Sequence, residues 1–337
     1  MEKLLRLWAF STIGVMVRRP MNSSPRFLQA PGADPAIERA ATIAGLLANP
    51  AFAAPKHFYD SLGSHLFDAI TELPEYYPTR TEASIFAAFA PEMARLAGTG
   101  GTLVDLGAGN GSKAARLFPL FEPRRYVAVD ISVDYLRGAL RRLQREHPGI
   151  ETVGIGMDFS ASLDLPPGVV DGRPLFFYPG SSIGNFAPGE ALAFLRRVRA
   201  RAGGGGLLIG VDLVKPRAVL EAAYDDALGV TAAFNRNLLR NLNRTIGSDF
   251  DPAAWQHVAF FDASQSRIEM HLEAGKDQLV RWPGGTRAFM RGERLHTENS
   301  YKYEPDAFAA LLHDAGFEPR AHWTDPQGWF AVFWASA

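Results

Sequence analysis

Short apolar runs separated by amphipathic stretches make up the middle of the chain. Runs of this length predict buried strands, and stretches in which apolar residues recur every three or four positions predict helices. The predicted strands cover residues 102–106, 125–131, 152–157, 174–178 and 207–214, with helices between the first three at 113–118 and 133–145. This alternation of strands and helices predicts an α/β fold built on a mostly parallel sheet.

Further predicted elements flank this pattern. Helical spacing precedes it at residues 35–47 and 61–70, and the C-terminus adds a helix at 306–315 and strands at 320–324 and 329–335. An internal segment is surplus to the sheet, with helical spacing at 217–246 and strand-like stretches at 258–274, 279–281 and 286–290. We therefore predict a seven-stranded, mostly parallel Rossmann-like sheet and a second α+β lobe, built from the N-terminal helices and this insertion.

Five segments follow from these elements. We expect an uncertain N-terminal extension at residues 1–20, N-terminal helices and a substrate loop at 21–82, the sheet domain at 83–214, the inserted lobe at 215–302 and a C-terminal completion of the sheet at 303–337. Aromatic and polar residues crowd residues 58–82, which Pro74 and Pro78 interrupt, so we predict a binding loop there. A cleft between the lobes is the expected place for a substrate.

The first predicted strand enters a glycine-rich turn. A dinucleotide-binding turn has the pattern G-x-G-x-x-G, in which the third glycine follows the second by three positions. That position is Ser112 here, and Gly107, Gly109 and Gly111 form G-x-G-x-G after Asp105. This pattern resembles motif I of the Rossmann-like methyltransferases that use S-adenosylmethionine (SAM). SAM has no phosphate groups and is compatible with a carboxylate at the strand end; a glycine-rich turn without a ligand is the alternative.

Acidic residues end the next two predicted strands. Asp130 follows the glycine turn by about 20 residues, where an acidic side chain usually binds ribose hydroxyls. Asp158 and Phe159 follow the third strand. A carboxylate beside an aromatic ring suits an adenine, because the carboxylate accepts from the exocyclic amine and the ring lies against the base. These residues predict a nucleoside-type cofactor at the carboxyl ends of the strands.

Charge and composition exclude several classes of protein. With 35 basic and 36 acidic residues the formal net charge is −1, so no general field attracts nucleic acid or anionic lipid. The chain has no cysteine, which excludes disulfides and cysteine-ligated metals and favours a cytoplasmic location. The eight histidines show no metal-ligand spacing, so no metal is expected. The apolar stretch at residues 7–17 is shorter than the roughly 18 residues that span a bilayer, and no membrane partner is expected.

Six segments in a fixed order are more specific than any single motif. They are LPEYYPTRTE (73–82), VDLGAGNGSK (104–113), YVAVDIS (126–132), FYPGSSIGNF (177–186), AYDDALGVTAAFNRNLL (223–239) and HTENSYKY (296–303). In this order they resemble the histidine-specific SAM-dependent methyltransferases of ergothioneine biosynthesis, which make hercynine from L-histidine. The resemblance spans nearly the whole chain after residue 35.

The resemblance implies a set of cofactor-binding residues. SAM is expected to contact Gly107, Lys113, Asp130, Asp158 and Phe159. An ammonium at the start of a helix can pair with the carboxylate of the methionine moiety, which gives Lys113 a chemical reason to be there. A solvated lysine in a first helical turn is the alternative.

The resemblance also implies an amino-acid site. It places Tyr59, Tyr76, Asn185 and Tyr224 around the α-amino and carboxylate groups of the amino acid. It places Glu298 and Ser300 at the imidazole, and Met270 as an apolar wall of the pocket. Side chains two residues apart in a strand share a face, so Glu298 and Ser300 can both meet ring nitrogens. The carboxylate accepts from an N–H, and the hydroxyl donates or accepts. The alternatives are a surface ion pair of Glu298 with Arg294 or Lys302, and ordinary interface aromatics.

The expected reaction is in-line methyl transfer from the sulfonium to the neutral α-amine, repeated to the trimethylated betaine. Tyr76, Asn185 and Tyr224 are expected to serve it by positioning, without a dedicated general base. One alternative is a methyltransferase for another amino acid or an indole amine such as a tryptophan derivative, which the polar pair Glu298 and Ser300 disfavours. Another is a noncatalytic SAM- or amino-acid-binding sensor. The expected partner is a small molecule; a monomer is compatible with the sequence, which does not define the oligomeric state.

Overall fold

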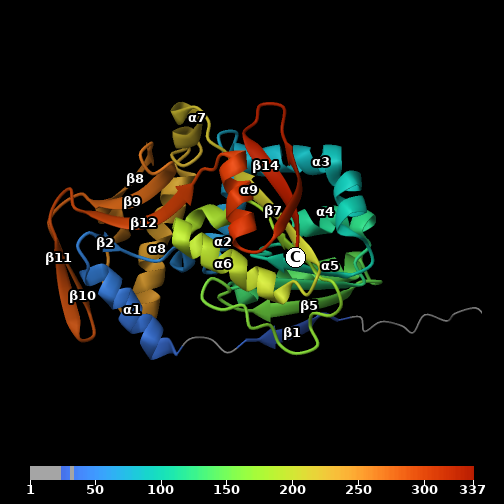
Figure 1. Cartoon of the computed structure of the whole chain (residues 1–337). Coiled ribbons are helices and arrows are strands. Elements are labelled where there is room, and N and C mark those ends of the chain that lie inside the picture. The colour runs from blue at the N-terminus through green and yellow to red at the C-terminus, as the bar shows by residue number, and fades with distance from the viewer. Residues whose placement is uncertain (1–23, 31–33) are drawn as a thin grey trace, which may run out of the picture.

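An eight-stranded sheet is the largest sheet of the computed structural model (Figure 1). The structure describes residues 24–30 and 34–337. The predicted extension at residues 1–20 lies outside the described residues. The strand order is β1-β5-β4-β3-β6-β7-β14-β13, and all pairs up to β7 are parallel. The strands are β1 (Arg26–Gln29), β3 (Thr102–Leu106), β4 (Arg125–Asp130), β5 (Glu151–Gly156), β6 (Leu175–Tyr178), β7 (Gly206–Asp212), β13 (Glu318–Thr324) and β14 (Phe330–Ser336).

The mostly parallel Rossmann-like sheet is confirmed, with one strand more than expected. The seven predicted strands are all present, and β14 pairs antiparallel with both β7 and β13. The additional strand, β1, lies parallel to β5 at the sheet edge. Only Phe27 and Leu28 of its four residues are apolar, which is too short a run for the hydrophobic pattern to reveal.

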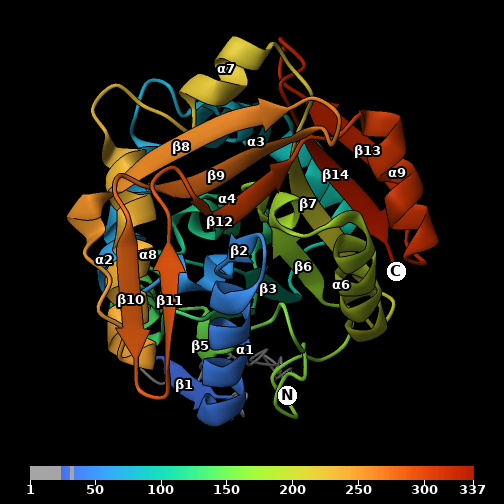
Figure 2. The same cartoon turned by 90° about the vertical axis from the view of Figure 1, so that its left-hand side faces the viewer.

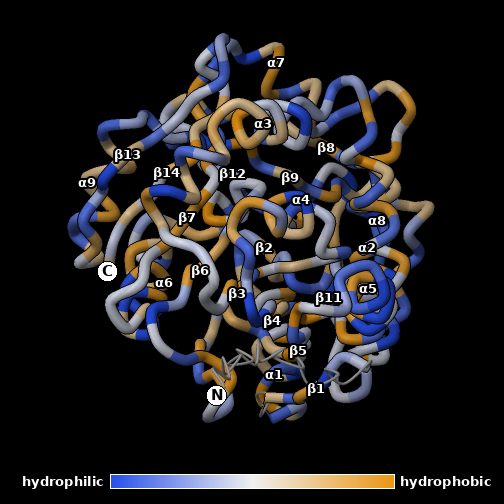
Figure 3. Tube along the Cα trace, turned by 90° about the vertical axis from the view of Figure 1, so that its right-hand side faces the viewer, coloured by the Kyte–Doolittle hydropathy of each residue, from blue (hydrophilic) through white to orange (hydrophobic). Residues whose placement is uncertain are grey.

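Helices cover both faces of this sheet. Alternate side chains of each strand point to opposite faces, so a strand buried on both sides contributes to two cores. One core joins the sheet to α6 (Pro188–Arg201) and α9 (Pro305–Asp314), and the other joins it to α3 (Tyr77–Ala97), α4 (Ser112–Phe121) and α5 (Val133–Glu146). The arginine-rich outer face of α5 is exposed, and the helix is largely hydrophilic in Figure 3.

A smaller mixed sheet with order β2-β12-β9-β8 lies beside the larger one (Figure 2). Its strands are β2 (Ala51–Phe52), β12 (Arg294–Tyr301), β9 (Arg267–Ala274) and β8 (Trp255–Asp262). The surrounding elements are α1 (Pro35–Leu47), η1 (Pro55–Phe58), α2 (Ser61–Thr71), η2 (Ser182–Asn185), α7 (Arg217–Ala222), α8 (Val230–Ile246), η3 (Pro252–Ala254) and the hairpin of β10 (Gln278–Trp282) and β11 (Gly285–Phe289). Because β2 pairs with β12, the N-terminal segment and the insertion share one sheet and one core.

Two predicted elements differ from the structure. Residues 58–82 are largely helical, since α2 fills their first half and α3 begins at Tyr77. Pro78 lies in the first turn of α3, where the missing N–H would have had no partner in the helix. The predicted helix over residues 217–246 is two helices, because Gly229 adopts a φ of 74° before α8 and Asp226 accepts from the first N–H groups of that helix.

Candidate active site

The glycine turn connects β3 to α4 with backbone angles that favour glycine. Gly107, Gly109 and Gly111 have φ values of 71°, 54° and 69°, which side-chain-bearing residues rarely adopt. The N–H of Gly109 donates to Asp130 Oδ2 at 2.9 Å, so the turn is held against the end of β4. A Cβ on Gly107 would lie 3.6 Å from the ring of Phe159, which places that ring directly over the turn.

A pocket of about 470 Å³ opens above this turn, a volume usual for small-molecule sites. The predicted cofactor residues that line it are Gly107, Asp130, Asp158 and Phe159. Burial raises the pKa of Asp130, although backbone N–H groups, among them those of Ser132 and Gly109, oppose this effect by donating to its carboxylate. Asp130 therefore presents a buried acceptor to the pocket.

Asp158, which also lines this pocket, is held in its charged form. Burial disfavours its charge, but hydrogen bonds from Ser160 and the ammonium of Lys56 outweigh burial and lower its pKa. Lys56 Nζ lies 3.2 Å from Asp158 and 2.7 Å from Glu38 on α1. No sequence motif pointed to Lys56, which reaches Asp158 from η1 only in the folded chain.

Lys113 and Asp105 lie away from this pocket. Lys113 Nζ donates to Glu82 Oε2 at 2.7 Å, and the other oxygen of Glu82 accepts from the N–H of Gly180 at 2.7 Å. Lys113 is therefore fixed to a buried carboxylate behind the wall that Gly180 forms. Asp105 accepts from the hydroxyl of Tyr126 at 2.7 Å, and burial raises its pKa to about 7. Asp105 does not line this pocket and acts within the core rather than as a ligand-facing acid.

A narrower pocket of about 50 Å³ adjoins the larger one. All seven residues expected around the amino acid line it: Tyr59, Tyr76, Asn185, Tyr224, Met270, Glu298 and Ser300. They come from six separate parts of the chain. The two pockets share Tyr59 and Asn185 together with Phe67 and Ser182, which the sequence analysis did not single out. A ligand in each pocket would therefore meet the other at these four residues.

Aromatic rings surround the junction of the pockets. The ring centroids of Tyr59 and Tyr76 lie 5.9 and 6.1 Å from that of Phe67, both edge to face, and Tyr76 meets Tyr224 at 6.4 Å. Burial raises the pKa of all three tyrosines well above the ordinary value, so they are neutral phenols. These interlocked rings fix the shape of the junction.

Glu298 points from β12 into the narrower pocket. Its neighbour Asn299 bonds the ring of His296, and Thr297, at an irregularity in the pairing of β12 with β9, donates to the carbonyl of Met270. Asn185 Nδ2 donates to Glu298 Oε2 at 3.2 Å. Burial raises the pKa of Glu298 to about 8, against the opposing effects of Lys302 and Asn185. The alternative of a surface ion pair is wrong, because Glu298 is buried, Arg294 pairs with Glu273 and Lys302 pairs with Asp212.

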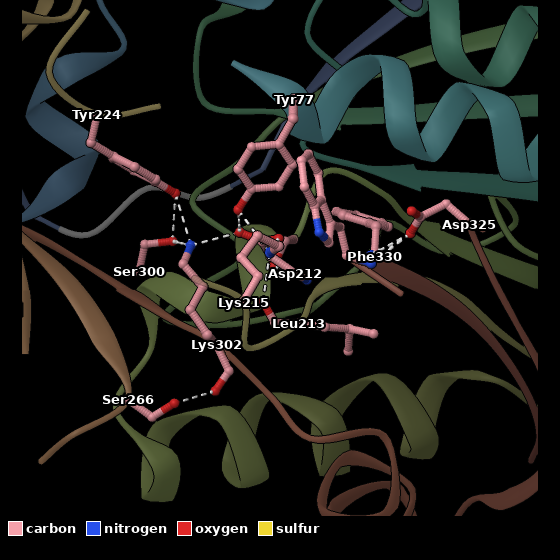
Figure 4. Close-up of polar contacts among 12 residues, drawn as sticks. Tyr77, Asp212, Leu213, Lys215, Tyr224, Ser266, Ser300, Lys302, Asp325 and Phe330 are labelled. Atoms are coloured by element: carbon pink, nitrogen blue, oxygen red, sulfur yellow. Dashed lines mark hydrogen bonds and ion pairs between the residues drawn. The ribbon is translucent and has the colours of Figure 1, made fainter. Parts of the chain in front are cut away.

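A buried charged cluster lies behind Ser300 and Tyr224 (Figure 4). Lys215 and Lys302 both donate to Asp212, and the hydroxyl of Tyr77 donates to the same carboxylate at 2.6 Å. Burial opposes the charge of Asp212, but the two lysines outweigh it and lower its pKa. Burial lowers the pKa of Lys215 to about 8. The sequence offered one clue, since Asp212 ends β7 at the edge where α/β sheets bind ligands.

The chain matches one protein family over most of its length. Residues 38–337 match the model for "Histidine-specific methyltransferase, SAM-dependent". The chain belongs to this family. This SAM-dependent methyltransferase is 42% identical to histidine N-alpha-methyltransferase of Mycolicibacterium smegmatis, covering 92% of this chain and 98% of that one. Its identity to the Mycobacterium tuberculosis protein of the same name is 44%, over 86% of this chain and 91% of the other.

A fungal relative is more distant. Ergothioneine biosynthesis protein 1 of Neurospora crassa is 29% identical over 79% of this chain and 31% of its own length. The methyltransferase contains, within the described residues, no helix long and apolar enough to cross a membrane. Residues 24–30 and 34–337 also hold no group of three or more acidic or histidine side chains arranged for a metal ion.

The larger pocket of this methyltransferase fits SAM by its chemistry. Asp130 and Asp158 are acceptors suited to ribose hydroxyls and to an exocyclic amine, and Phe159 offers a flat apolar surface. The position of a third dinucleotide-type glycine is occupied by Ser112, whose N–H bonds the side chain of Asn110 and so is committed within the turn. These features agree with a nucleoside ligand that has no pyrophosphate.

Proposed function

We propose that this enzyme methylates the α-amine of L-histidine, up to the trimethylated betaine hercynine, as a step of ergothioneine biosynthesis. The observation that carries the proposal is the junction of two pockets at Tyr59, Phe67, Ser182 and Asn185. One pocket suits SAM, and the other contains a buried carboxyl group and a hydroxyl two residues apart on β12. The names of the two mycobacterial relatives and of the fungal relative support the same substrate and pathway.

In this proposal the cofactor is held at the carboxyl ends of β3, β4 and β5. When bound, SAM supplies an electrophilic methyl group on its sulfonium. Asp130 accepts from the ribose hydroxyls, Asp158 from the adenine amine, and Phe159 packs on the base beside Gly107. Lys113 acts from behind Gly180, which lines the narrower pocket beside the cofactor, and Glu82 fixes its ammonium there.

The amino acid occupies the narrower pocket. Glu298 and Ser300 bind the imidazole, and Met270 forms an apolar wall beneath it. Asn185 and Tyr224 hold the α-carboxylate, while Tyr59 and Tyr76 flank the α-amine at the junction. The contact between Asn185 and Glu298 supports this assignment of residues, because it links the group proposed for the α-carboxylate to the group proposed for the imidazole.

Positioning rather than acid–base chemistry serves the reaction. In-line transfer requires the amine nitrogen, the methyl carbon and the sulfur to be collinear, and a fixed geometry supplies much of the rate acceleration. Asn185, Tyr224 and Tyr76 provide that geometry from three different elements. The faces of Tyr59 and Tyr76 also favour the growing quaternary ammonium through cation–π attraction.

The polar pair Glu298 and Ser300 disfavours the main alternative, an enzyme for tryptophan or another indole amine. An indole in this pocket would leave the buried Glu298 and Ser300 without full hydrogen bonding. The test is incubation with SAM and each common amino acid, followed by mass analysis. We expect histidine to gain up to three methyl groups; a gain on tryptophan with none on histidine would overturn the proposal.

We further propose that the enzyme acts in the cytoplasm on this small molecule without a nucleic-acid or membrane partner. The nearly balanced charge, −1 overall, supports this assignment. The two sheets and their separate cores support the proposed division into a sheet domain and a substrate lobe, except that β1, within residues 21–82, pairs with β5 in the larger sheet.

A further inference from the structure

Lys302 has all three of its ammonium hydrogens committed. Its Nζ lies 2.8 Å from Ser300 Oγ, 3.1 Å from the hydroxyl of Tyr224 and 2.8 Å from Asp212 Oδ2. The side chain is fully buried, and an ammonium has three donors and no acceptor. Figure 4 shows Lys302 reaching these partners from the strand end that also carries Ser300. Both pocket hydroxyls must therefore accept a hydrogen bond from Lys302.

The two hydroxyls also bind each other. Tyr224 and Ser300 lie 2.7 Å apart, and either oxygen can be the donor in this bond. The pair has two hydrogens, and one of them is used between the two oxygens. A single hydrogen is left for a ligand. If Tyr224 keeps it, Ser300 has donated its own and can only accept; if Ser300 keeps it, Tyr224 can only accept.

We propose that Lys302 is a positioning residue that sets the hydrogen-bond polarity of the substrate pocket, so that Ser300 accepts a hydrogen from the substrate ring when Tyr224 donates to the carboxylate. This inference rests on the proposed function, which places an anionic carboxylate at Tyr224. A carboxylate only accepts, so Tyr224 must spend the remaining hydrogen on it. The ring nitrogen that faces Ser300 must then carry a hydrogen.

The direction of the hydrogen bond at Ser300 determines whether a protonated or a bare ring nitrogen faces Glu298. A neutral imidazole has one N–H and one bare nitrogen. With the N–H at Ser300, the bare nitrogen faces Glu298, which must donate to it. Burial supports this role, because it raises the pKa of Glu298 to about 8 and keeps the carboxyl group protonated at neutral pH. Through the hydroxyls of Ser300 and Tyr224, Lys302 thereby selects one tautomer of neutral histidine.

The test compares Lys302→Met with Lys215→Met. Lys215 is the matched control, because it is buried and donates to the same Asp212. Its other side-chain partner is the hydroxyl of Tyr77, not that of Ser300 or Tyr224. Calorimetry on the complex with S-adenosylhomocysteine measures binding of L-histidine and of the two thiazolylalanine isomers that attach through ring carbon 4 or 5. Each isomer has sulfur in place of one ring nitrogen and no ring N–H.

We expect the wild type to prefer histidine over both isomers by about tenfold or more, because Ser300 finds no hydrogen to accept. In Lys302→Met the hydroxyl pair can reorient, so the preference over the isomer whose nitrogen faces Ser300 should fall about fivefold or more below its wild-type value; the part that remains comes from the sulfur that this isomer places at Glu298. Lys215→Met should keep the wild-type preference. An unchanged preference in Lys302→Met, or the same loss in Lys215→Met, would overturn the inference.

A spectroscopic measurement on the wild-type enzyme covers a Lys302 variant that does not fold. Histidine labelled with ¹⁵N in the ring is bound beside S-adenosylhomocysteine, and the nitrogen that faces Ser300 is identified as the one whose resonance moves in Ser300→Ala. That nitrogen should have the shift of an N–H, and a bare nitrogen there would overturn the inference. If the enzyme methylates histidine but these results are not obtained, the proposed function stands and the inference about Lys302 is overturned. If histidine does not bind, both the proposed function and the inference are overturned.

Discussion

Replacement of Glu298 by alanine perturbs the ring-binding end of the substrate pocket. Glu298 is 7% exposed, and its carboxyl group accepts from Asn185 Nδ2 at 3.2 Å. Its removal deletes the hydrogen bond to the imidazole and leaves the Asn185 amide without this partner. Each buried polar group that loses its partner costs about 1–3 kcal/mol. Two such losses amount to about 2–6 kcal/mol, or roughly 30- to 20,000-fold in affinity.

The expected result is a rise in the KM for histidine within this range at saturating SAM, with product measured by mass analysis. Affinity for SAM, measured by calorimetry without histidine, should stay within twofold, because Glu298 does not line the larger pocket. Glu298→Gln is the matched control, since its amide keeps the volume and one donor, and its KM should rise less than tenfold. A KM for Glu298→Ala within threefold of the wild type, or an equal loss of SAM affinity, would refute this account of ring recognition.

Three further predictions follow from the buried groups of the site. The pKa of Glu298 is about 8 when folded and 4.5 ordinarily, so the wild type loses stability as pH rises between these values; the Tm advantage of Glu298→Gln without ligand should therefore grow from pH 5 to pH 8, and a constant Tm difference would contradict it. Asp158→Asn should weaken SAM binding about tenfold in calorimetry while the histidine KM at saturating SAM stays unchanged; unaltered SAM affinity would place the adenine elsewhere. Tyr77→Phe removes a hydroxyl that bonds Asp212 and Lys215 and should cost about 1–3 kcal/mol in urea unfolding, with histidine affinity within twofold; a stability equal to the wild type would show that this hydroxyl is dispensable.

The hydrophobic pattern predicted the larger sheet well because its strands are buried on both faces. Leu103, Val104 and Leu106 are almost completely inaccessible, so their apolar character reports their environment directly. The pattern failed where tertiary contacts decide the conformation. Pro78 looked like an interruption because its place in the first turn of α3 depends on where that helix begins.

Candidate site residues were predictable only where a motif carried them. Glu298 and Ser300 lie on one face of β12, as the two-residue spacing required, and the motifs supplied Tyr59, Tyr76 and the others. Lys302 appeared as an exposed partner for an ion pair, because lysine is almost never fully buried. Its burial depends on Asp212, which is 90 positions away in the sequence and becomes its neighbour only in the folded chain. Sequence spacing contains no information about such a pair.

The short strand β2 has a consequence for the order in which the enzyme is made. Ala51 pairs with Leu295 and Phe52 with His296, so the earliest part of the smaller sheet waits for a strand synthesised near the end of the chain. Contacts of such separation form late, because the intervening chain must first be ordered. Glu298 and Ser300, which line the narrower pocket, belong to that same late strand. On the ribosome, the glycine turn between β3 and α4 is synthesised long before β12, so a nascent chain lacks Glu298 and Ser300 until its synthesis is almost finished.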